Sequence, residues 1–491
     1  MGKVINKYGF FIAITLLTIA YLFFPSHNLS MDSLNYGSAV KYGETLFEPH
    51  HLLYSYFNYL LYSFLNYITP FSIDALMFMQ FLNGVFALLC LLLFHGIMQK
   101  LTGDRQKAHV WTFFIGCSFG VMRFAVEAET YIIPIFFSLL SSRFYLNYLN
   151  TLKSKNVLLA GLFASIACLF HQVQLLWGIG LFFGFLRTRK IKNILYFLLP
   201  ALSVLVVYSF VLVFYENTSF SFENLIKYSL SYYYSNDSDT NIGRVNFLMT
   251  PISFFRTFFQ VHGNLIDLLH IMPFLYISIF LTLAFLVLSF YHFKKSVKFF
   301  KRGKFWKYDF QSTHLLIFVF QLAFAFFSHG NAEFMVMLPF LIPFFLYLFL
   351  DFKLKPVVYF SLAMFIWNFC FAVFPNHHFD YQNNKELITF IKENPDKVFV
   401  LNEGDNVFCR YYYEFGVNEY DRIANSYDMD KIRNFANEHK IIYTDVLTKK
   451  SSFNRASIAL SFDKPDFVPV RHIKHIDAVM GGFDIDEVVL K

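Results

Sequence analysis

The chain has 491 residues, of which 56% are hydrophobic and only 15% are charged. Soluble domains contain about 25% charged residues, so the composition excludes an ordinary soluble protein and indicates an integral membrane protein. The formal net charge of +7 is unevenly divided: residues 1–374 carry 26 Lys and Arg against 15 Asp and Glu, and residues 375–491 carry 15 against 19. Because the excess positive charge lies in the apolar part, it indicates membrane topology and excludes a nucleic-acid partner.

The apolar part predicts about eleven transmembrane helices, each long enough or nearly long enough for a hydrocarbon core of roughly 30 Å. The expected spans are 8–24, 74–98, 109–122, 131–149, 157–171, 173–186, 194–215, 271–292, 313–328, 334–351 and 357–374. The stretch 50–68 is rich in tyrosine and amphipathic, which predicts a helix lying at the membrane interface. The fold class is therefore a polytopic α-helical membrane protein with outer loops at 25–73 and 216–270.

Basic residues between the predicted spans indicate the orientation. With the N-terminus in the cytoplasm, twenty Lys and Arg fall in cytoplasmic segments, seven of them between Lys294 and Lys307, and five fall outside. Because positive residues stay on the cytoplasmic side, we expect the C-terminal part to be extracytoplasmic. We expect a multi-pass protein of a bacterial inner or plasma membrane, in contact with membrane lipid. The five outer basic residues are Lys41, Arg123, Lys227, Arg244 and Arg256.

The composition changes after residue 374. The segments 385–393, 406–415 and 430–439 have helical patterns, and 397–401 and 440–444 read as buried strands. We therefore expect residues 375–491 to form a small α/β domain.

Three outer segments contain ionisable groups that a purely structural role does not require. The first contains Asp32, His50 and His51, the second Arg123, Glu127, Glu129 and Tyr131, and the third His171. Ionisable residues at a membrane boundary are costly unless they have a function. A shared site is one interpretation of these groups.

Each of these residues also has a structural interpretation. Asp32 could cap a short helix that starts at Ser33, and Glu127 and Glu129 could cap the fourth span. His171 could be an ordinary residue at a helix end. His50 and His51 could bind a metal, but no third ligand has suitable spacing.

The order of these segments resembles the GT-C superfamily, membrane glycosyltransferases that use polyprenyl-phosphate-linked sugars. An aspartate follows the first span, and a Pro-x-x-Leu-Tyr-like element at Pro49–Tyr54 opens the interfacial helix. The stretches 125–137 and 161–171 look like the protein O-mannosyltransferase branch. Residues 331–339 resemble the family's late arginine-tyrosine-leucine-leucine-proline segment, except that Met335 and Val336 replace the basic and aromatic pair.

The resemblance implies an inverting glycosyltransferase that moves a sugar from a polyprenyl-phosphate carrier to a protein, lipid or glycan acceptor at the outer face. Asp32 would be the general base, and Glu127, Glu129 and Tyr131 would belong to the substrate site. The departing phosphate needs positive charge or hydrogen-bond donors. The outer candidates for that role are Arg123, Arg244, Arg256, Lys41, His50, His51 and His171.

Two other functions fit the same composition. The first is a transporter or flippase of a lipid-linked glycan, although such proteins tend to carry internal repeats and polar residues near the midplane, and no repeat is evident. The second is a non-catalytic scaffold of GT-C type. No cofactor is predicted, and the sequence leaves a divalent metal open.

Overall fold

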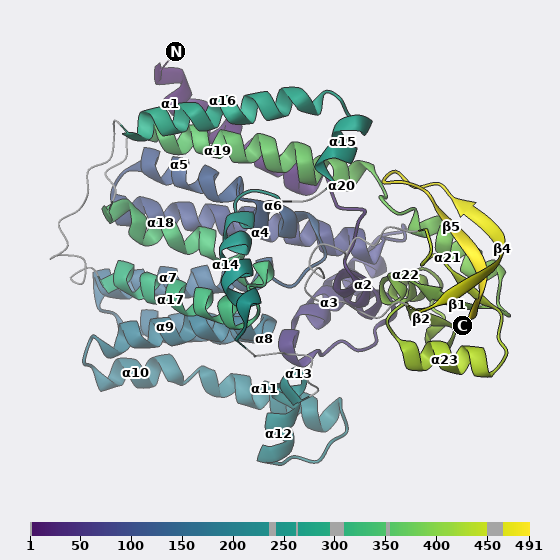
Figure 1. Cartoon of the computed structure of the whole chain (residues 1–491). Coiled ribbons are helices and arrows are strands. Elements are labelled where there is room, and N and C mark those ends of the chain that lie inside the picture. The colour runs from purple at the N-terminus through teal and green to yellow at the C-terminus, as the bar shows by residue number, and fades with distance from the viewer. Residues whose placement is uncertain (1, 235–241, 262–263, 295–308, 350–353, 449–464) are drawn as a thin grey trace.

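A computed structural model describes residues 2–234, 242–261, 264–294, 309–349, 354–448 and 465–491 of the chain. It consists of a bundle of roughly aligned helices with a smaller α/β domain at one end (Figure 1). Most of the basic cluster at 294–307, and Lys353, lie outside the described residues. The predicted role of that cluster stays a prediction.

The bundle and its connections consist of helices of widely different length. In chain order they are α1 (Gly2–Leu22), α2 (Met31–Tyr42), α3 (Tyr54–Ile68), α4 (Ala75–Thr102), α5 (Arg105–Gly116), α6 (Phe119–Val126), α7 (Ile132–Thr151), α8 (Ser154–Phe170), α9 (Leu175–Leu186), α10 (Ile191–Leu198), α11 (Ala201–Phe214), α12 (Phe222–Ser229), α13 (Ser231–Tyr234), α14 (Arg244–Arg256), α15 (Leu265–Ile271), α16 (Leu275–Lys294), α17 (Asp309–Phe327), α18 (Leu338–Phe349), α19 (Leu354–Asn368) and α20 (Phe374–His378). Short 3-10 turns lie at Pro49–His51, Gln172–Gln174 and Ala332–Met335, and a π-turn at Phe369–Val373 joins α19 to α20.

Every predicted apolar run is mainly helical in its described residues, and the chain is a multi-pass membrane protein. Among the described residues, six helical segments are long and apolar enough to cross a membrane, seven if a bent pair is one span, and four shorter apolar helices accompany them. The length criterion alone does not establish eleven spans. The run predicted as one span at 109–122 is in fact broken into α5 and α6, which meet at 63°.

The segment between α1 and α4 also differs from the prediction. The expected helix at 50–68 consists of a 3-10 turn at Pro49–His51 followed by α3 from Tyr54, because a proline at the first position starts a new helical turn. Ahead of it lies α2, which begins at Met31 and ends at Gly43 in the left-handed conformation (φ 74°). A glycine adopts this conformation without a Cβ penalty.

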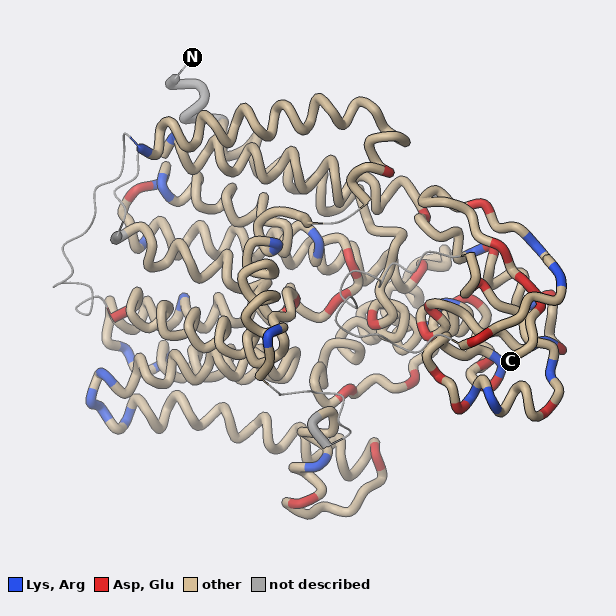
Figure 2. The backbone as a smooth tube through the Cα atoms, viewed as in Figure 1, with Lys and Arg blue, Asp and Glu red and all other residues tan. Residues whose placement is uncertain are grey.

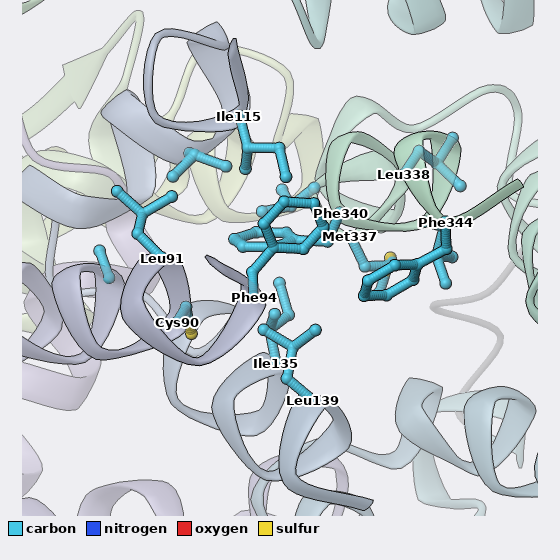
Figure 3. Packing of buried hydrophobic residues seen from close by; sticks show 14 of the residues in the cluster. Cys90, Leu91, Phe94, Ile115, Ile135, Leu139, Met337, Leu338, Phe340 and Phe344 are labelled. Carbon is cyan, nitrogen blue, oxygen red and sulfur yellow. The ribbon is translucent and has the colours of Figure 1, made fainter. Parts of the chain in front are cut away.

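The largest hydrophobic core lies within the bundle, where α4, α5, α7 and α18 meet (Figure 3). Its labelled side chains are Cys90, Leu91, Phe94, Ile115, Ile135, Leu139, Met337, Leu338, Phe340 and Phe344, all fully buried. Glycine permits close helix contact elsewhere, since a Cβ on Gly161 of α8 would lie 2.2 Å from the carbonyl oxygen of Phe197. Small residues at helix crossings are typical of membrane bundles.

In its described residues, the α/β domain contains three α-helices and five strands. The helices are α21 (Asn384–Glu393), α22 (Gly404–Phe415) and α23 (Met429–Asn437), and the strands are β1 (Val398–Leu401), β2 (Ile423–Asn425), β3 (Ile442–Thr444), β4 (Phe467–Ile476) and β5 (Phe483–Leu490). The sheet order is β2-β1-β3-β5-β4, with parallel pairing of β1 to β2 and β3 and antiparallel pairing of β5 to β3 and β4. The predicted helices and the strands β1 and β3 are present, whereas β2, β4 and β5 were not predicted.

The α/β domain packs on the bundle through α22 and α2 (Figure 1). The ammonium group of Lys41 and the hydroxyl of Tyr42 donate hydrogen bonds to the carbonyl oxygen of Tyr413, at 2.6 and 2.9 Å. The hydroxyl of Tyr413 in turn donates to the carboxylate of Asp74 at 2.6 Å. Lys41, one of the outer candidates for a phosphate contact, therefore binds the α/β domain.

Charges separate along the bundle. Figure 2 shows Lys and Arg in the connections at the end away from the α/β domain, whereas Asp and Glu gather between the bundle and that domain. This arrangement places most carboxylates of the bundle at one end, beside α2.

Candidate functional site

Asp32 lies in the first turn of α2, at the end of the bundle nearest the α/β domain. The helix is capped by Ser30, whose hydroxyl accepts the amide hydrogen of Ser33 at 3.0 Å. The alternative that Asp32 is the cap is therefore wrong. The Asp32 side chain is exposed, and within the described part of the chain its carboxylate has no hydrogen-bond or ion-pair partner.

Two features of its surroundings affect the pKa of Asp32. Partial desolvation raises the pKa of this carboxyl group, and the nearby charge of Glu333 raises it further. A carboxylate with a raised pKa and free oxygens has the properties of a general base.

Glu129 is buried behind Asp32, with 3% of its surface exposed. One of its carboxylate oxygens accepts hydrogen bonds from the hydroxyls of Ser30 and of Ser33, the latter at 3.2 Å. Burial raises the pKa of Glu129 well above its ordinary value, and the charges of Glu333, Glu127 and Asp32 add to the effect. The cap of α2 therefore also binds the most desolvated carboxyl group of the cluster.

Arg123 of α6 supplies positive charge beside these carboxylates. Its Nε atom lies 3.1 and 3.0 Å from the two carboxylate oxygens of Glu127, and its Nη2 atom lies 3.7 Å from Glu333. Glu333 also accepts a hydrogen bond from the hydroxyl of Tyr131 at 3.1 Å. Glu127 therefore pairs with an arginine instead of capping the fourth span.

The remaining predicted arginines occupy opposite ends of α14. Arg256 is close enough to Arg123, Glu127 and Glu333 for their charges to interact, and its buried Nε has no hydrogen-bond partner among the described residues. Arg244 is exposed at the other end of this 13-residue helix, about 18 Å away at 1.5 Å per residue. The structure brings Arg256 into the cluster and leaves Arg244 outside it.

The three predicted histidines lie together on the other side of Tyr131. The ring centroids of His51 and His171 are 4.3 Å apart, and Tyr131 lies 5.1 Å from His171. Tyr36, one turn after Asp32 on α2, contacts His51 at 5.8 Å, and His50 lies beside His51 at 6.2 Å. This row of rings connects His171 with the helix that carries Asp32.

His171 is a neutral hydrogen-bond donor. Burial lowers its pKa to about 3, and its Nδ1 accepts the amide hydrogen of Val173 at 3.3 Å. The ring proton therefore lies on Nε2, which is buried without a partner among the described residues. His50 and His51 likewise each have a buried Nδ1 atom without a described partner, and burial lowers the pKa of both rings.

Asn83 of α4 fixes the backbone that carries the two glutamates. Its side-chain amide donates hydrogen bonds to the carbonyl oxygens of Glu127 and Glu129, at 2.8 and 2.7 Å. The turn between α6 and α7 is therefore bound to the centre of the bundle.

The side chains of the cluster include groups of the kinds that bind metal ions. Among the described residues, no group of three or more His, Cys, Asp or Glu side chains is placed to hold a metal ion. The adjacent histidines His50 and His51 contact aromatic rings, including Tyr232 at 4.0 Å from His50.

Neither a family model nor a curated protein sequence matches the chain. Solved structures do share its architecture. The crystal structure of ArnT from Cupriavidus metallidurans bound to undecaprenyl phosphate matches with a TM-score of 0.55 at 9% identity, over 99% of this chain and 98% of that one. The apo oligosaccharyltransferase of Archaeoglobus fulgidus matches with a TM-score of 0.50 at 12% identity, over 90% of this chain and 70% of that one.

The chain shares the overall fold of these proteins. The same oligosaccharyltransferase tethered to an acceptor peptide also matches with a TM-score of 0.50, at 10% identity. The shared fold spans nearly the whole chain. Within it, the carboxylate cluster lies where the bundle meets the C-terminal domain.

Sequence patterns did not reveal several members of this site. Ser30 and Ser33 bind Glu129, Asn83 orients the turn, and Glu333 joins Arg123 to Tyr131. Glu333 lies in residues 331–339, the segment that resembles the late GT-C motif. That resemblance was the one signal in the sequence that could have indicated Glu333 as part of the site. The predicted residues that do come together are Asp32, Arg123, Glu127, Glu129, Tyr131, His50, His51, His171 and Arg256.

Proposed function

We propose that the chain is a glycosyltransferase that moves a sugar from a polyprenyl-phosphate carrier to an acceptor hydroxyl. The observation that carries this proposal is the exposed carboxylate of Asp32, which has no partner among the described residues. It lies beside the buried Glu129 and the partly buried pair Arg123 and Glu333, in a GT-C fold. The similar ArnT structure contains undecaprenyl phosphate, which supports a polyprenyl-phosphate donor.

Asp32 acts as the general base in the proposed reaction. Its carboxylate takes the proton of the acceptor hydroxyl while the acceptor oxygen forms a bond to the anomeric carbon. The bond from that carbon to the phosphate oxygen breaks, and its electron pair leaves with the polyprenyl phosphate. Attack opposite the leaving group inverts the anomeric centre.

Arg256 and His171 are the groups best placed by their chemistry to receive the phosphate. Arg123 is already paired with Glu127, whereas the Nε of Arg256 and the Nε2 of His171 lack described partners. A guanidinium and a neutral N–H donor both bind phosphate oxygens. The buried Glu129 carboxyl stiffens the cap of α2 and so orients Asp32.

The proposed topology follows the charge distribution. Eleven spans, with the N-terminus in the cytoplasm and the α/β domain outside, put Asp32 on the outer face. Mannose is the first donor sugar to test, because the sequence resembles the protein O-mannosyltransferase branch.

The test uses the purified full-length protein and a panel of polyprenyl-phosphate sugars. Loss of a general base lowers rates by about 10²- to 10⁴-fold, so Asp32→Asn should lose transfer by this factor. Asp267→Asn is the matched control, since Asp267 is also an exposed aspartate in a helix's first turn, on α15. Undiminished transfer by Asp32→Asn would rule out the base, and lipid-glycan flux in proteoliposomes without transfer would rule out the enzyme.

A further inference from the structure

The chain enters the α/β domain through residues 376–381, and residues 25–29, which follow α1, hold this connection in place. The backbone amide of His27 donates a hydrogen bond to the carbonyl oxygen of Asn376 at 2.8 Å. The side-chain amide of Asn28 donates to the same oxygen at 3.1 Å. The two segments therefore form one structural unit, which we call the domain junction.

Helix α22 of the α/β domain contacts the domain junction from the other side. The Nη2 atom of Arg410 lies 3.4 Å from the carbonyl oxygen of His27, and the side-chain amide of Asn406 lies 3.4 Å from the carbonyl oxygen of Leu29. Both distances are longer than those of typical hydrogen bonds. The contacts between α22 and the junction are therefore weak, and added charge there affects whether the domain stays docked on the bundle.

Three histidines gather at the domain junction. The ring centroids of His27 and His377 are 5.1 Å apart, and those of His377 and His378 are 5.9 Å apart. His27 and His378 are exposed, so protons reach them from solvent. The ordinary pKa of histidine puts its charge change between about pH 5 and 8. Mild acidification therefore adds positive charge to rings that already lie close together.

The ring of His377 has a defined orientation. Its Nδ1 atom lies 2.8 Å from the carbonyl oxygen of Pro25, which only accepts hydrogen bonds, so Nδ1 carries the proton of the neutral ring. When the ring becomes charged, the second proton is taken up at Nε2. Because His27 lies against this ring, charges on the two histidines repel each other.

The environment of His27 opposes its protonation. Partial desolvation is the largest cause of the lowered pKa of His27, and the charges of His377, Arg410 and His378 add to it, whereas that of Asp380 acts against it. The docked domain therefore binds fewer protons than an undocked domain in which His27 is fully solvated. As pH falls below the ordinary histidine pKa of about 6.5, proton uptake favours the undocked form.

The other charged groups at the junction come from α22 and from the connection. His27 is the one ionisable side chain within residues 25–29. Arg410 is itself under the influence of Asp380 and Glu414. The balance of charge on α22 therefore changes in favour of repulsion only when the histidines become charged.

We propose that the histidines of the domain junction make docking of the α/β domain sensitive to pH, so that acidification separates α22 from α2 while the bundle stays folded. Helix α22 packs on α2, which carries Asp32 in its first turn (Figure 1). Undocking therefore uncovers the end of the bundle that contains Asp32. This behaviour goes beyond the proposed transfer reaction and does not depend on it.

The test measures hydrogen exchange of the purified full-length protein, corrected for the pH dependence of intrinsic exchange. If undocking takes up one proton, its equilibrium constant rises about tenfold per pH unit. Exchange of α2 and α22 should therefore become faster by up to about tenfold per pH unit between about pH 6.5 and 5.5. Exchange of α7 and α17, inside the bundle, should stay unchanged.

Two kinds of variant should move this response in opposite directions. The double variant His27→Gln with His377→Asn removes two titrating rings, and the asparagine amide can still donate to Pro25, so the response should largely disappear. Asp380→Asn removes the one acidic group that acts on His27 among the described residues. It should therefore enlarge the ratio of α22 exchange rates between the two pH values, an effect that purely structural histidines would not give.

His439→Asn is the matched control. His439 is exposed in the same domain but follows α23, and its left-handed backbone (φ 53°) suits asparagine. This variant should keep the response of the wild type, and melting temperatures at about pH 7.5 show whether each variant is folded. An α22 exchange rate that does not change with pH in the wild type overturns the inference. A full response in the double variant, or faster exchange throughout the bundle, also overturns it.

Discussion

The hydroxyl of Ser30 donates a hydrogen bond to the carboxylate of Glu129 while it accepts the amide hydrogen that caps α2. These two residues are 99 positions apart in the chain. The contact connects the helix that carries Asp32 to the turn between α6 and α7. The charge state of Glu129 should therefore affect both the stability of the protein and the position of Asp32.

Glu129→Gln should change how stability depends on pH. Because burial raises the folded-state pKa of Glu129, the folded protein binds more protons than the unfolded chain above the ordinary pKa of about 4.3. The wild type should therefore lose stability as pH rises from about 4.3 through the raised folded-state pKa. Glutamine does not titrate, so the Glu129→Gln variant should not show this loss. The difference between its melting temperature and that of the wild type should therefore increase with pH in detergent solution.

Glu393→Gln is the matched control, because Glu393 is exposed at the end of α21. Its melting temperature should follow that of the wild type across the same pH range. A constant difference between Glu129→Gln and the wild type at all pH values would show that Glu129 does not titrate in this way.

Much of the architecture could be predicted, because hydrophobic runs and helical periodicity are local signals. The unpredicted strands have weaker signals. β2 has only three residues, and β4 is an edge strand that is mostly exposed and contains Pro469, so it lacks a clear alternation of buried and exposed residues. The break after Gly116 coincides with the Gly116–Gly120 segment, whose glycines and serine interrupt an otherwise continuous apolar run.

Arg123→Ala should strongly destabilise the bundle. The Glu127 side chain is only 6% exposed, and the substitution would leave its charge buried without its partner. Breaking such a pair costs about 3–5 kcal/mol. Chemical denaturation should show this loss, and the double variant Arg123→Met with Glu127→Gln should recover part of it.

The pair Lys227–Glu223 is a suitable comparison because it has the same four-residue spacing but is exposed. Replacing Lys227 by alanine should leave the denaturation midpoint unchanged within error, since exposed ion pairs contribute little. Equal effects of the two alanine substitutions would contradict a special role for Arg123.

The sequence predicts which segments of the chain form the site better than it predicts which residues belong to it. Residue types near the predicted span ends identified Asp32, Glu129 and His171, because charged groups are rare there. Glu333 contacts Tyr131 from 202 positions away, and a single sequence contains no information on that pairing. Arg244 and Arg256 looked equivalent in sequence, and only the direction of α14 distinguishes them.

Tyr413→Phe should loosen the contact between the α/β domain and the bundle. The variant loses the hydrogen bond to Asp74 at 2.6 Å and the one accepted from the Leu76 amide at 3.3 Å. A hydrogen bond to a charged group contributes about 1.5–3 kcal/mol. Hydrogen exchange of α2 and α22 should become faster, with the rest of the bundle unaffected.

Tyr420→Phe removes a hydroxyl from an exposed tyrosine of the same domain and should not alter exchange in α2. If both variants behave alike, Tyr413 does not hold the domain in place. If exchange increases throughout the bundle, the substitution has disturbed the fold as a whole.

Cysteine labelling distinguishes the two sides of the membrane. Glu414 in the α/β domain and Lys190 in the connection between α9 and α10 are both exposed. The proposed topology predicts that they lie on opposite faces. Glu414→Cys should react with a membrane-impermeant maleimide in intact cells, and Lys190→Cys only in inside-out vesicles.

Wild type provides the background, because Cys90, Cys117 and Cys409 are buried and the other two cysteines are partly buried within helices. Labelling of both variants from one side would contradict the predicted topology, and labelling of each from the opposite side would invert it and move Asp32 to the cytoplasmic face.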